Sequence, residues 1–408
     1  MTETVTETRA ADTDFRGAGP RALGAALRAS RADTLATFAR FEAALPGLDV
    51  PQTDTLNPPR WELGHIGWFA RFWLQRNPER HRGCHADPHA PRSPAFAPDS
   101  DALFDSSRVA QHSRWQLPLP TAEALRESLE AGLSQALQLL HEGGASDDEL
   151  YFHRLVLAHE DMHHEAALYM AQALGLPELA DAPPRWQPRP LAPERRALAF
   201  DAGTFEQGWQ GAGFAFDNEL GAHASPLPAC HIDSRVLCWA DYLPFAEAGG
   251  YAQPRWWSPA GLAWLQATGL RAPRSLRGAP WQVQSGGQWQ ALDRTLPACH
   301  LSAFEAEAWC AWAGRRLPSE GEWERAAVQS GPAFAWGAVW EWTTSTFEPY
   351  EGFVAHPYRD YSAPWFGSRR VLRGASFATQ RRLHHLRYRN FFTPGRNDIF
   401  AGFRSCAL

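Results

Sequence analysis

The segment 150–174, LYFHRLVLAHEDMHHEAALYMAQAL, constrains the fold most because it places two histidines on the apolar face of a long helix. Its apolar residues recur every three or four positions, which is the spacing of one helical face. His159 and His163 occupy this stripe one turn apart, so both imidazoles can reach one metal ion. Ser146 predicts a capping box at the start of the helix, and Gly175 predicts its end. A pair of core histidines that bond only to neighbouring side chains is the alternative interpretation.

Length and composition indicate a soluble protein with two domains. The chain has 408 residues, of which 44% are hydrophobic and 21% charged, enough for two apolar cores. A net charge of −6 without any basic tract gives no surface for nucleic acid, and no apolar run approaches the ~20 residues of a membrane span. Six scattered cysteines lack CxxC spacing, and the N-terminus lacks a signal-peptide layout. We therefore expect a reduced, cytoplasmic protein whose partners include neither nucleic acid nor membrane. The oligomeric state remains unknown from the sequence.

The two halves of the chain differ in character. Residues 1–15 predict a disordered tail, and residues 16–180 carry four helical segments whose inward stripes predict a four-helix bundle. Residues 181–193 contain five prolines and predict a linker. Residues 194–408 hold short β-type runs and glycine turns, and fifteen of the 19 tryptophans lie after residue 180. The predicted fold class is α+β. The helices are expected at about 21–45, 59–77, 121–140 and 146–174.

A third histidine can join the first two inside the bundle. His65 holds an apolar position in the helix that follows Pro59 and can therefore face the same interior. Three imidazoles would hold a divalent metal and leave coordination positions free. Iron would have room for O₂ and substrates, whereas zinc would hold one water, and the spacing does not separate these two.

The same helix contains the string HExxH, from His159 to His163, which is also the signature of zinc proteases. In that interpretation Glu160 would be the general base, and a third ligand would be needed downstream, for which Glu178 is the main candidate. His153 and His164 point away from the stripe and are expected to be solvated or to support the ligands.

In their order along the chain, the motifs resemble those of the iron-dependent sulfoxide synthase family of ergothioneine biosynthesis. The matching motifs are Leu63-Gly-His65-Ile with Trp68-Phe69, His159-Glu-x-x-His163, Gly314-RRLPSEGEWERAA, Val339-WEWTTS, Tyr350-EGF, Val371-LRGASFAT, Arg389-Asn-Phe and Ala401-GFR. The resemblance covers nearly the whole chain. It implies a DinB-like bundle followed by a formylglycine-generating-enzyme/C-type-lectin-like domain. It also implies a non-haem Fe(II) bound by the three histidines, and O₂-driven bonding of a chalcogen to the imidazole C2 of hercynine, a histidine betaine.

Further site residues follow from the resemblance alone. Tyr358 matches the tyrosine that supplies a proton or an electron near the iron, and Tyr361 matches a substrate-binding tyrosine. Asn390 resembles the amide near the betaine carboxylate, and Phe391 an aromatic of the trimethylammonium pocket, where a π face suits a quaternary ammonium. Arg396 resembles the arginine that binds a substrate carboxylate.

Two departures from the family pattern point to the selenoneine synthase branch, which uses a selenosugar in place of a thiol. Met162 stands where many sulfoxide synthases have a glutamine contact to hercynine. Phe392 stands where enzymes using cysteine or γ-glutamylcysteine have an aspartate, so a charged partner for an amino-acid donor is lost. The segment 104–120 also lacks the arginine-rich pattern that suits a γ-glutamyl carboxylate. Candidate sugar contacts there are Arg108, His112, Arg114 and Trp115.

Three alternatives stay open at this point. The first is a sulfoxide synthase that uses cysteine, γ-glutamylcysteine or a thiosugar. The second is a zinc metallopeptidase based on HExxH. The third is a lectin-like module that binds a sugar or betaine without catalysis. Neither of the last two needs His65 together with the buried histidine pair.

Overall fold

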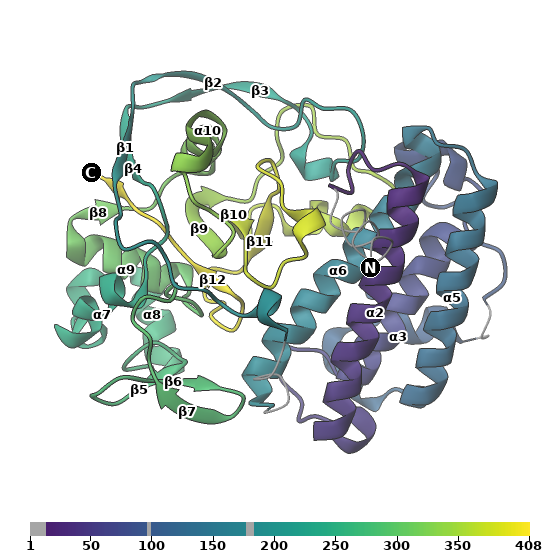
Figure 1. The fold of residues 1–408 in the computed structure, drawn as a ribbon, viewed down its shortest axis with the longest axis horizontal. Coiled ribbons are helices and arrows are strands. Elements are labelled where there is room, and N and C mark those ends of the chain that lie inside the picture. The colour runs from purple at the N-terminus through teal and green to yellow at the C-terminus, as the bar shows by residue number, and fades with distance from the viewer. Residues whose placement is uncertain (1–13, 96–98, 177–182) are drawn as a thin grey trace, which may run out of the picture.

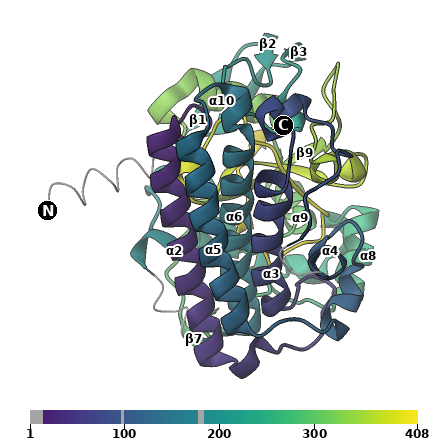
Figure 2. The ribbon, with the colours of Figure 1, turned by 90° about the vertical axis from the view of Figure 1, so that its right-hand side faces the viewer.

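The computed structural model describes residues 14–95, 99–176 and 183–408. Four helices stand side by side in the first half of the chain, as Figures 1 and 2 show. They are α2 (Pro20–Ala44), α3 (Pro59–Ala70), α5 (Ala122–Glu142) and α6 (Asp147–Leu174). A π-helical stretch, Arg71–Gln75, continues α3. The predicted order of a helical bundle followed by a sheet-rich half is confirmed.

Helix α6 is the element that both halves of the protein share. Ser146 forms the predicted capping box with Glu149, and Gly175 ends the helix with a left-handed φ of 68°. The bundle packs on one side of α6 and the second half of the chain on the other (Figure 1). His164 is buried where it meets Thr37 of α2 and Trp186. His153 is buried as well, so the expectation that either ring is solvated was wrong.

The long connection between α3 and α5 is not structureless. Its described residues contain three short helical pieces, namely η3 (Arg80–His85), α4 (Ser100–Phe104) and η4 (Gln111–Gln116). Two tryptophans of α3 hold α4 in place, because Trp61 donates to the carbonyl of Leu103 and Trp68 donates to Asp101. This connection therefore covers the face of α3 that carries His65.

The second half is built from four small sheets with helices around them (Figure 1). The sheet nearest the bundle has the order β11-β10-β9-β12, with β9 (Val339–Thr346), β10 (Arg370–Ala375), β11 (Asn390–Phe392) and β12 (Ala401–Gly402). A second sheet, β1-β4-β13-β8, comprises Ala197–Phe200, Cys230–Asp233, Cys406–Ala407 and Arg315–Arg316. The smaller sheets pair β2 (Gly203–Gln207) with β3 (His223–Leu227), and β5 (Leu276–Arg277) with β6 (Gln282–Ser285) and β7 (Gln288–Ala291). The helices are α7 (Trp239–Glu247), α8 (Pro259–Thr268), α9 (Ala303–Ala313) and α10 (Glu320–Ser330).

Buried polar contacts join α6 to the second half. Asp161 forms an ion pair with Arg382 in which Nε and Nη2 each donate, at 2.7 and 2.6 Å. One turn further along, the carboxylate of Glu165 accepts hydrogen bonds from Trp340, Ser376 and Thr379. Because such groups are costly to bury unpaired, these contacts fix how the two halves sit on each other.

Described residues of the expected tail and of the expected linker take part in this packing. Residues 1–13 of the tail lie outside the described residues, but Phe15 is fully buried against Phe214, so the expected disorder was wrong for this residue. In the expected linker, whose residues 181–182 also lie outside the described part, Trp186 is buried and packs on His164 at 4.4 Å between ring centres. No helix in the described part of the chain is long and apolar enough to cross a membrane.

Candidate metal centre and substrate cavity

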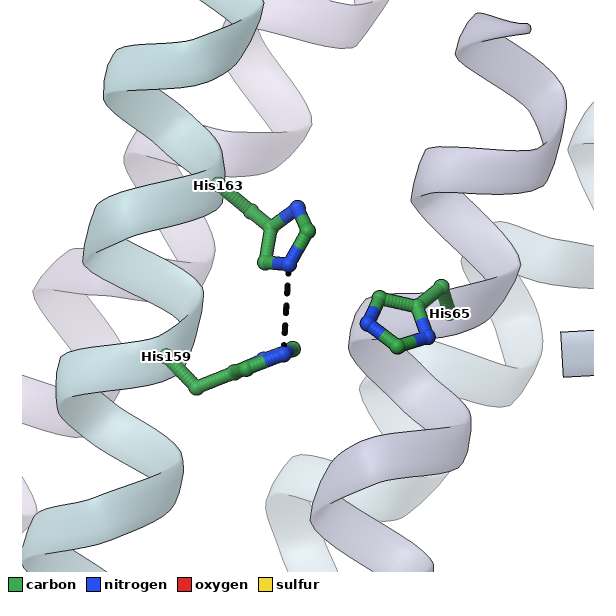
Figure 3. Close-up of side chains that lie close together, drawn as sticks. All are labelled: His65, His159 and His163. Carbon is green, nitrogen blue, oxygen red and sulfur yellow. Dashed lines mark hydrogen bonds between the residues drawn. The ribbon is translucent and has the colours of Figure 1, made fainter. Parts of the chain in front are cut away.

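The three predicted metal ligands meet between α3 and α6 (Figure 3). His65, His159 and His163 each offer a ring nitrogen, and these atoms lie within 4.8 Å of one another. Nε2 of His159 and Nε2 of His163 are 3.2 Å apart. His65 and His159 are buried, while His163 is partly open to a cavity. Three converging imidazole nitrogens suit a divalent transition metal such as iron or zinc.

Hydrogen bonds orient two of these rings. Nδ1 of His65 donates to the carbonyl of Phe104 at 2.8 Å, and Nδ1 of His163 donates to Glu62 at 2.5 Å. With the proton on Nδ1, the lone pair of Nε2 is left for a metal. Burial, followed by the neighbouring His163, lowers the pKa of His65 to about 3, so this ring is neutral at physiological pH. The donor set therefore fits a metal ion in both position and protonation.

Glu62 is a residue that the sequence interpretation missed. Burial works against its ionisation, but the imidazole of His163 and the bonds from His163 and Asn57 outweigh burial and lower its pKa to about 2. The carboxylate thus stays ionised opposite a ligand. A signal was present in the sequence, because Glu62 precedes His65 by three residues and so shares its helical face.

Arg114 supports the same centre from the connection between α3 and α5. It donates to Asn57 at 2.7 Å, and Asn57 in turn donates to Glu62 at 2.5 Å. Its guanidinium also lies 3.8 Å from the centre of the Trp61 ring, which stacks on His65. Arg114 also lines the cavity described below, so its role as a sugar contact stays a prediction, beside the observed role of its guanidinium in holding Asn57 and Trp61.

The other predicted sugar contacts lie away from the site. Arg108 and His112 are exposed and do not line the cavity. The indole of Trp115 donates to the carbonyl of Val50. The structure gives these three predictions no support, because none of the three residues lines the cavity.

A cavity of about 720 Å³ opens on the histidines between α6 and the second half of the chain. The bundle contributes His159, Met162, His163, Ala166 and Tyr169, and the second half contributes Trp340, Tyr358, Tyr361, Tyr388 and β11. Cavities of this size that lie at domain junctions and combine apolar walls with a few polar groups are typical ligand sites.

Both predicted tyrosines face this cavity. The ring of Tyr358 packs on Phe69 and lies 6.3 Å from the ring of His159. Burial and then the nearby Asp360 raise the pKa of Tyr358, so its phenol stays protonated at neutral pH. The hydroxyl of Tyr361 is 3.8 Å from the sulfur of Met162, which places these two predicted residues in contact.

The predicted β11 residues also reach the cavity, whereas Arg396 does not line it. The side-chain oxygen of Asn390 accepts from the amide of Phe391, and the Phe391 ring lies edge-on to Tyr361 at 5.8 Å. Arg396 forms a two-bond ion pair with Asp398 and lies 5.1 Å from the ring centre of Phe392. The role of Arg396 in binding a substrate carboxylate therefore stays a prediction, and in this structure its guanidinium is paired with Asp398.

Glu160 does not fit the role of a peptidase base. Its carboxylate forms a buried ion pair with Arg31 of α2, at 2.7 and 2.9 Å, and so faces away from the histidines. The alternative third ligand, Glu178, lies outside the described residues. Within the described part, His65 occupies the third position.

The two glutamates give a matched test of this arrangement. Glu62→Gln is expected to weaken metal binding by about 10-fold or more, because the charged acceptor of a ligand imidazole is lost. Glu160→Gln is expected to leave metal affinity unchanged, since this residue faces Arg31. Competition with a chelator for Co²⁺ measures both affinities. A larger loss for Glu160→Gln than for Glu62→Gln would contradict the assignment.

Comparisons with known proteins match both halves of the chain. Residues 184–338 and 333–407 match the FGE-sulfatase family, described as a sulfatase-modifying factor enzyme 1-like domain. The chain is 32% identical to "Hercynine oxygenase" of Mycolicibacterium smegmatis over 86% of this chain and 90% of that protein. The identity and both coverages are the same for "Hercynine oxygenase" of Mycobacterium tuberculosis. "Formylglycine-generating enzyme" of Streptomyces coelicolor is 27% identical over 51% of this chain and 86% of that protein. The chain therefore belongs to the hercynine oxygenase family, with a sulfatase-modifying factor enzyme 1-like domain in its second half.

Proposed function

We propose that this protein is a non-haem Fe(II), O₂-dependent selenoneine synthase. It joins the selenium of a selenosugar of the 1-seleno-glucose type to the imidazole C2 of hercynine and gives a selenoxide. The observation that carries the proposal is the three-histidine centre, which opens on a cavity with aromatic walls. The family membership supports hercynine and O₂ as co-substrates, because the relatives carry the name hercynine oxygenase.

The aromatic wall suits the trimethylammonium group of hercynine. Tyr361 and Phe391 lie next to each other on the wall, and Trp340 and Tyr388 pack edge to face behind them. Aromatic faces attract a quaternary ammonium through their negative π surfaces, most strongly where water is excluded. Hercynine would thus bind with its ammonium on this wall and its imidazole toward His159 and His163.

The charges around the cavity favour a donor that carries no carboxylate. Among the described residues that line the cavity, Arg114 is the one arginine, and its Nη1 and Nη2 are bonded to Asn57 and to the carbonyl of Val109. A cysteine or γ-glutamylcysteine carboxylate would therefore lose its hydration without gaining an ion pair. A sugar carries hydroxyls instead. Uncharged polar residues that could meet these hydroxyls are Thr55, Asn57, Ser106, Ser107 and Gln111.

The overall reaction balances with one O₂. The C2–H bond of hercynine and the Se–H bond of the donor break, and one C–Se bond forms. One oxygen atom ends on selenium, and the other leaves as water with the two hydrogens. Iron held by His65, His159 and His163 would supply the O₂ chemistry. The protein orients both substrates in the cavity, and Tyr358 holds its proton beside the centre.

Replacing the tyrosine hydroxyl tests its role. Tyr358→Phe keeps the ring packing on Phe69 but removes the proton donor. We expect kcat to fall by about 10²-fold or more, as for other positioned proton donors, or the product ratio to change, with KM for hercynine little altered. The matched control Tyr361→Phe should act mainly on KM. Unchanged turnover and products in Tyr358→Phe would remove this residue from the chemistry.

Donor competition tests the proposed reaction. Anaerobically purified, Fe(II)-loaded protein would be given hercynine, air and three donors in parallel: the selenosugar, the matching thiosugar and γ-glutamylcysteine. Mass spectrometry of the products should show a hercynine–selenium adduct in preference to any sulfur adduct. A γ-glutamylcysteine adduct as the main product would establish the alternative, an ergothioneine-type sulfoxide synthase with an altered pocket.

A further inference from the structure

A second cluster of metal-binding side chains lies at the opposite end of α6 from the linker. Cys84, His85 and Asp148 each offer one donor atom, and the three atoms lie within 4.8 Å of one another. Cys84 and His85 belong to η3, and Asp148 lies in the first turn of α6. This cluster contains a sulfur donor, which the three-histidine centre lacks. It also does not depend on the proposed function.

The backbone is shaped to bring η3 onto the start of α6. Gly83 has a φ of 57° and a ψ of −132°, a conformation that only glycine adopts readily. A Cβ at this position would lie 2.7 Å from the Cα of Asp148 and 2.5 Å from its carboxylate. Any side chain at Gly83 would therefore push η3 away, and with it the next two residues, Cys84 and His85.

The acidic residues at the start of α6 have separate partners, except for Asp148. Asp147 accepts from Arg154 and from the amide of Gly213. Glu149 accepts from Ser146 in the capping box. No arginine in the described part of the chain forms an ion pair with Asp148, whose carboxylate faces Cys84 and His85 instead.

The thiol of Cys84 holds its proton in the protein alone, because burial, and then the charge of Asp148, raise its pKa. A divalent metal ion would displace this proton and bind the thiolate and the carboxylate at once.

We propose that Cys84, His85 and Asp148 bind a zinc-class divalent metal ion. Thiolate, imidazole and carboxylate together are the usual zinc donors, and the exposure of His85 and Asp148 leaves a fourth position for water. The ion ties η3 to α6 near Tyr151, whose hydroxyl is hydrogen-bonded to His356, two residues before Tyr358.

Cobalt titration separates this site from the three-histidine centre. Reduced protein would be titrated anaerobically with Co²⁺ while thiolate-to-cobalt charge transfer is followed in the near ultraviolet. The band should appear in the wild type and in His163→Ala, because it requires sulfur and not the histidine centre. The band should be lost in Cys84→Ser. In Asp148→Asn it should still form, but the affinity for Co²⁺ should be about 10-fold or more lower. Stoichiometric Zn²⁺ should displace the cobalt.

Cys230→Ser is the matched control. A hydrogen bond from Cys406 lowers the pKa of Cys230 to about 6, which makes Cys230 the competing thiolate. The cobalt band should survive this substitution. Absence of the band in the wild type, its persistence in Cys84→Ser, its loss in Cys230→Ser, or failure of Zn²⁺ to displace Co²⁺ would each overturn the proposal.

Discussion

Replacing His163 with alanine is expected to abolish stoichiometric iron binding and, with it, O₂ consumption. The substitution removes one of three converging donors and also takes away the imidazole that donates to the buried carboxylate of Glu62. The loss of affinity should exceed the roughly 10–100-fold that the loss of a supporting outer group costs. Anaerobic equilibrium dialysis against Fe(II), followed by metal analysis, measures this directly.

The neighbouring histidine provides the control for this prediction. His164 is fully buried, and its ring is hydrogen-bonded to Thr37 at 2.9 Å and packs on Trp186. His164→Gln should lower stability while leaving the iron stoichiometry intact. Stoichiometric iron in His163→Ala, or its loss only in His164→Gln, would contradict the assignment of the ligands.

Asp161→Ala is expected to destabilise the protein by about 3–5 kcal/mol, the usual cost of breaking a buried ion pair by removing one partner. Both side chains are buried, with exposed fractions of 2% for Arg382 and 0% for Asp161. The substitution removes the carboxylate that pairs with the guanidinium of Arg382 between α6 and the second half of the chain. It also removes the acceptor of Ser30. Urea unfolding, followed by circular dichroism, measures the loss.

An exposed ion pair serves as the reference for this effect. Asp49 is 77% exposed where it pairs with Arg60 at 3.0 Å. Asp49→Ala should therefore cost no more than about 1 kcal/mol. Similar midpoints for Asp161→Ala and the wild type would show that this buried pair does not hold the two halves together. Because the cavity lies at the same junction, Asp161→Ala should also raise KM for hercynine.

The three metal ligands, His65, His159 and His163, could be predicted because helical periodicity is a local property. The stripe of α6 places His159 and His163 on one face regardless of what packs against it. His65 required one further assumption, that an inward residue of one bundle helix meets the inward face of another. The same reasoning would have identified Glu62, which shares the face of His65.

The hydrogen bonds that hold the three histidines in place could not be predicted from periodicity. Arg114 reaches Glu62 through Asn57, and this chain of contacts exists only once the connection between α3 and α5 has folded over α3. Arg396 looked free for the same reason, because its pairing with Asp398 depends on the local turn.

The polar face of α6 shows the limit most clearly. By periodicity, Asp161 and Glu165 should face solvent, yet both are buried. Their partners include Arg382 and Thr379, which lie more than 200 positions away in the chain and belong to the other half. A helix that packs against other elements on two sides has no solvent-exposed face. The periodicity of α6 alone does not show that the second half of the chain packs on it.

Oxygen uptake by the Fe(II)-loaded protein tests the central claim most directly. An electrode would follow O₂ in the presence of hercynine alone, the selenosugar alone, and both together, in the wild type and in His163→Ala. The account predicts uptake that requires both substrates, equals the hercynine consumed, and is absent from the variant. Uptake that is independent of hercynine, or undiminished in His163→Ala, would contradict it.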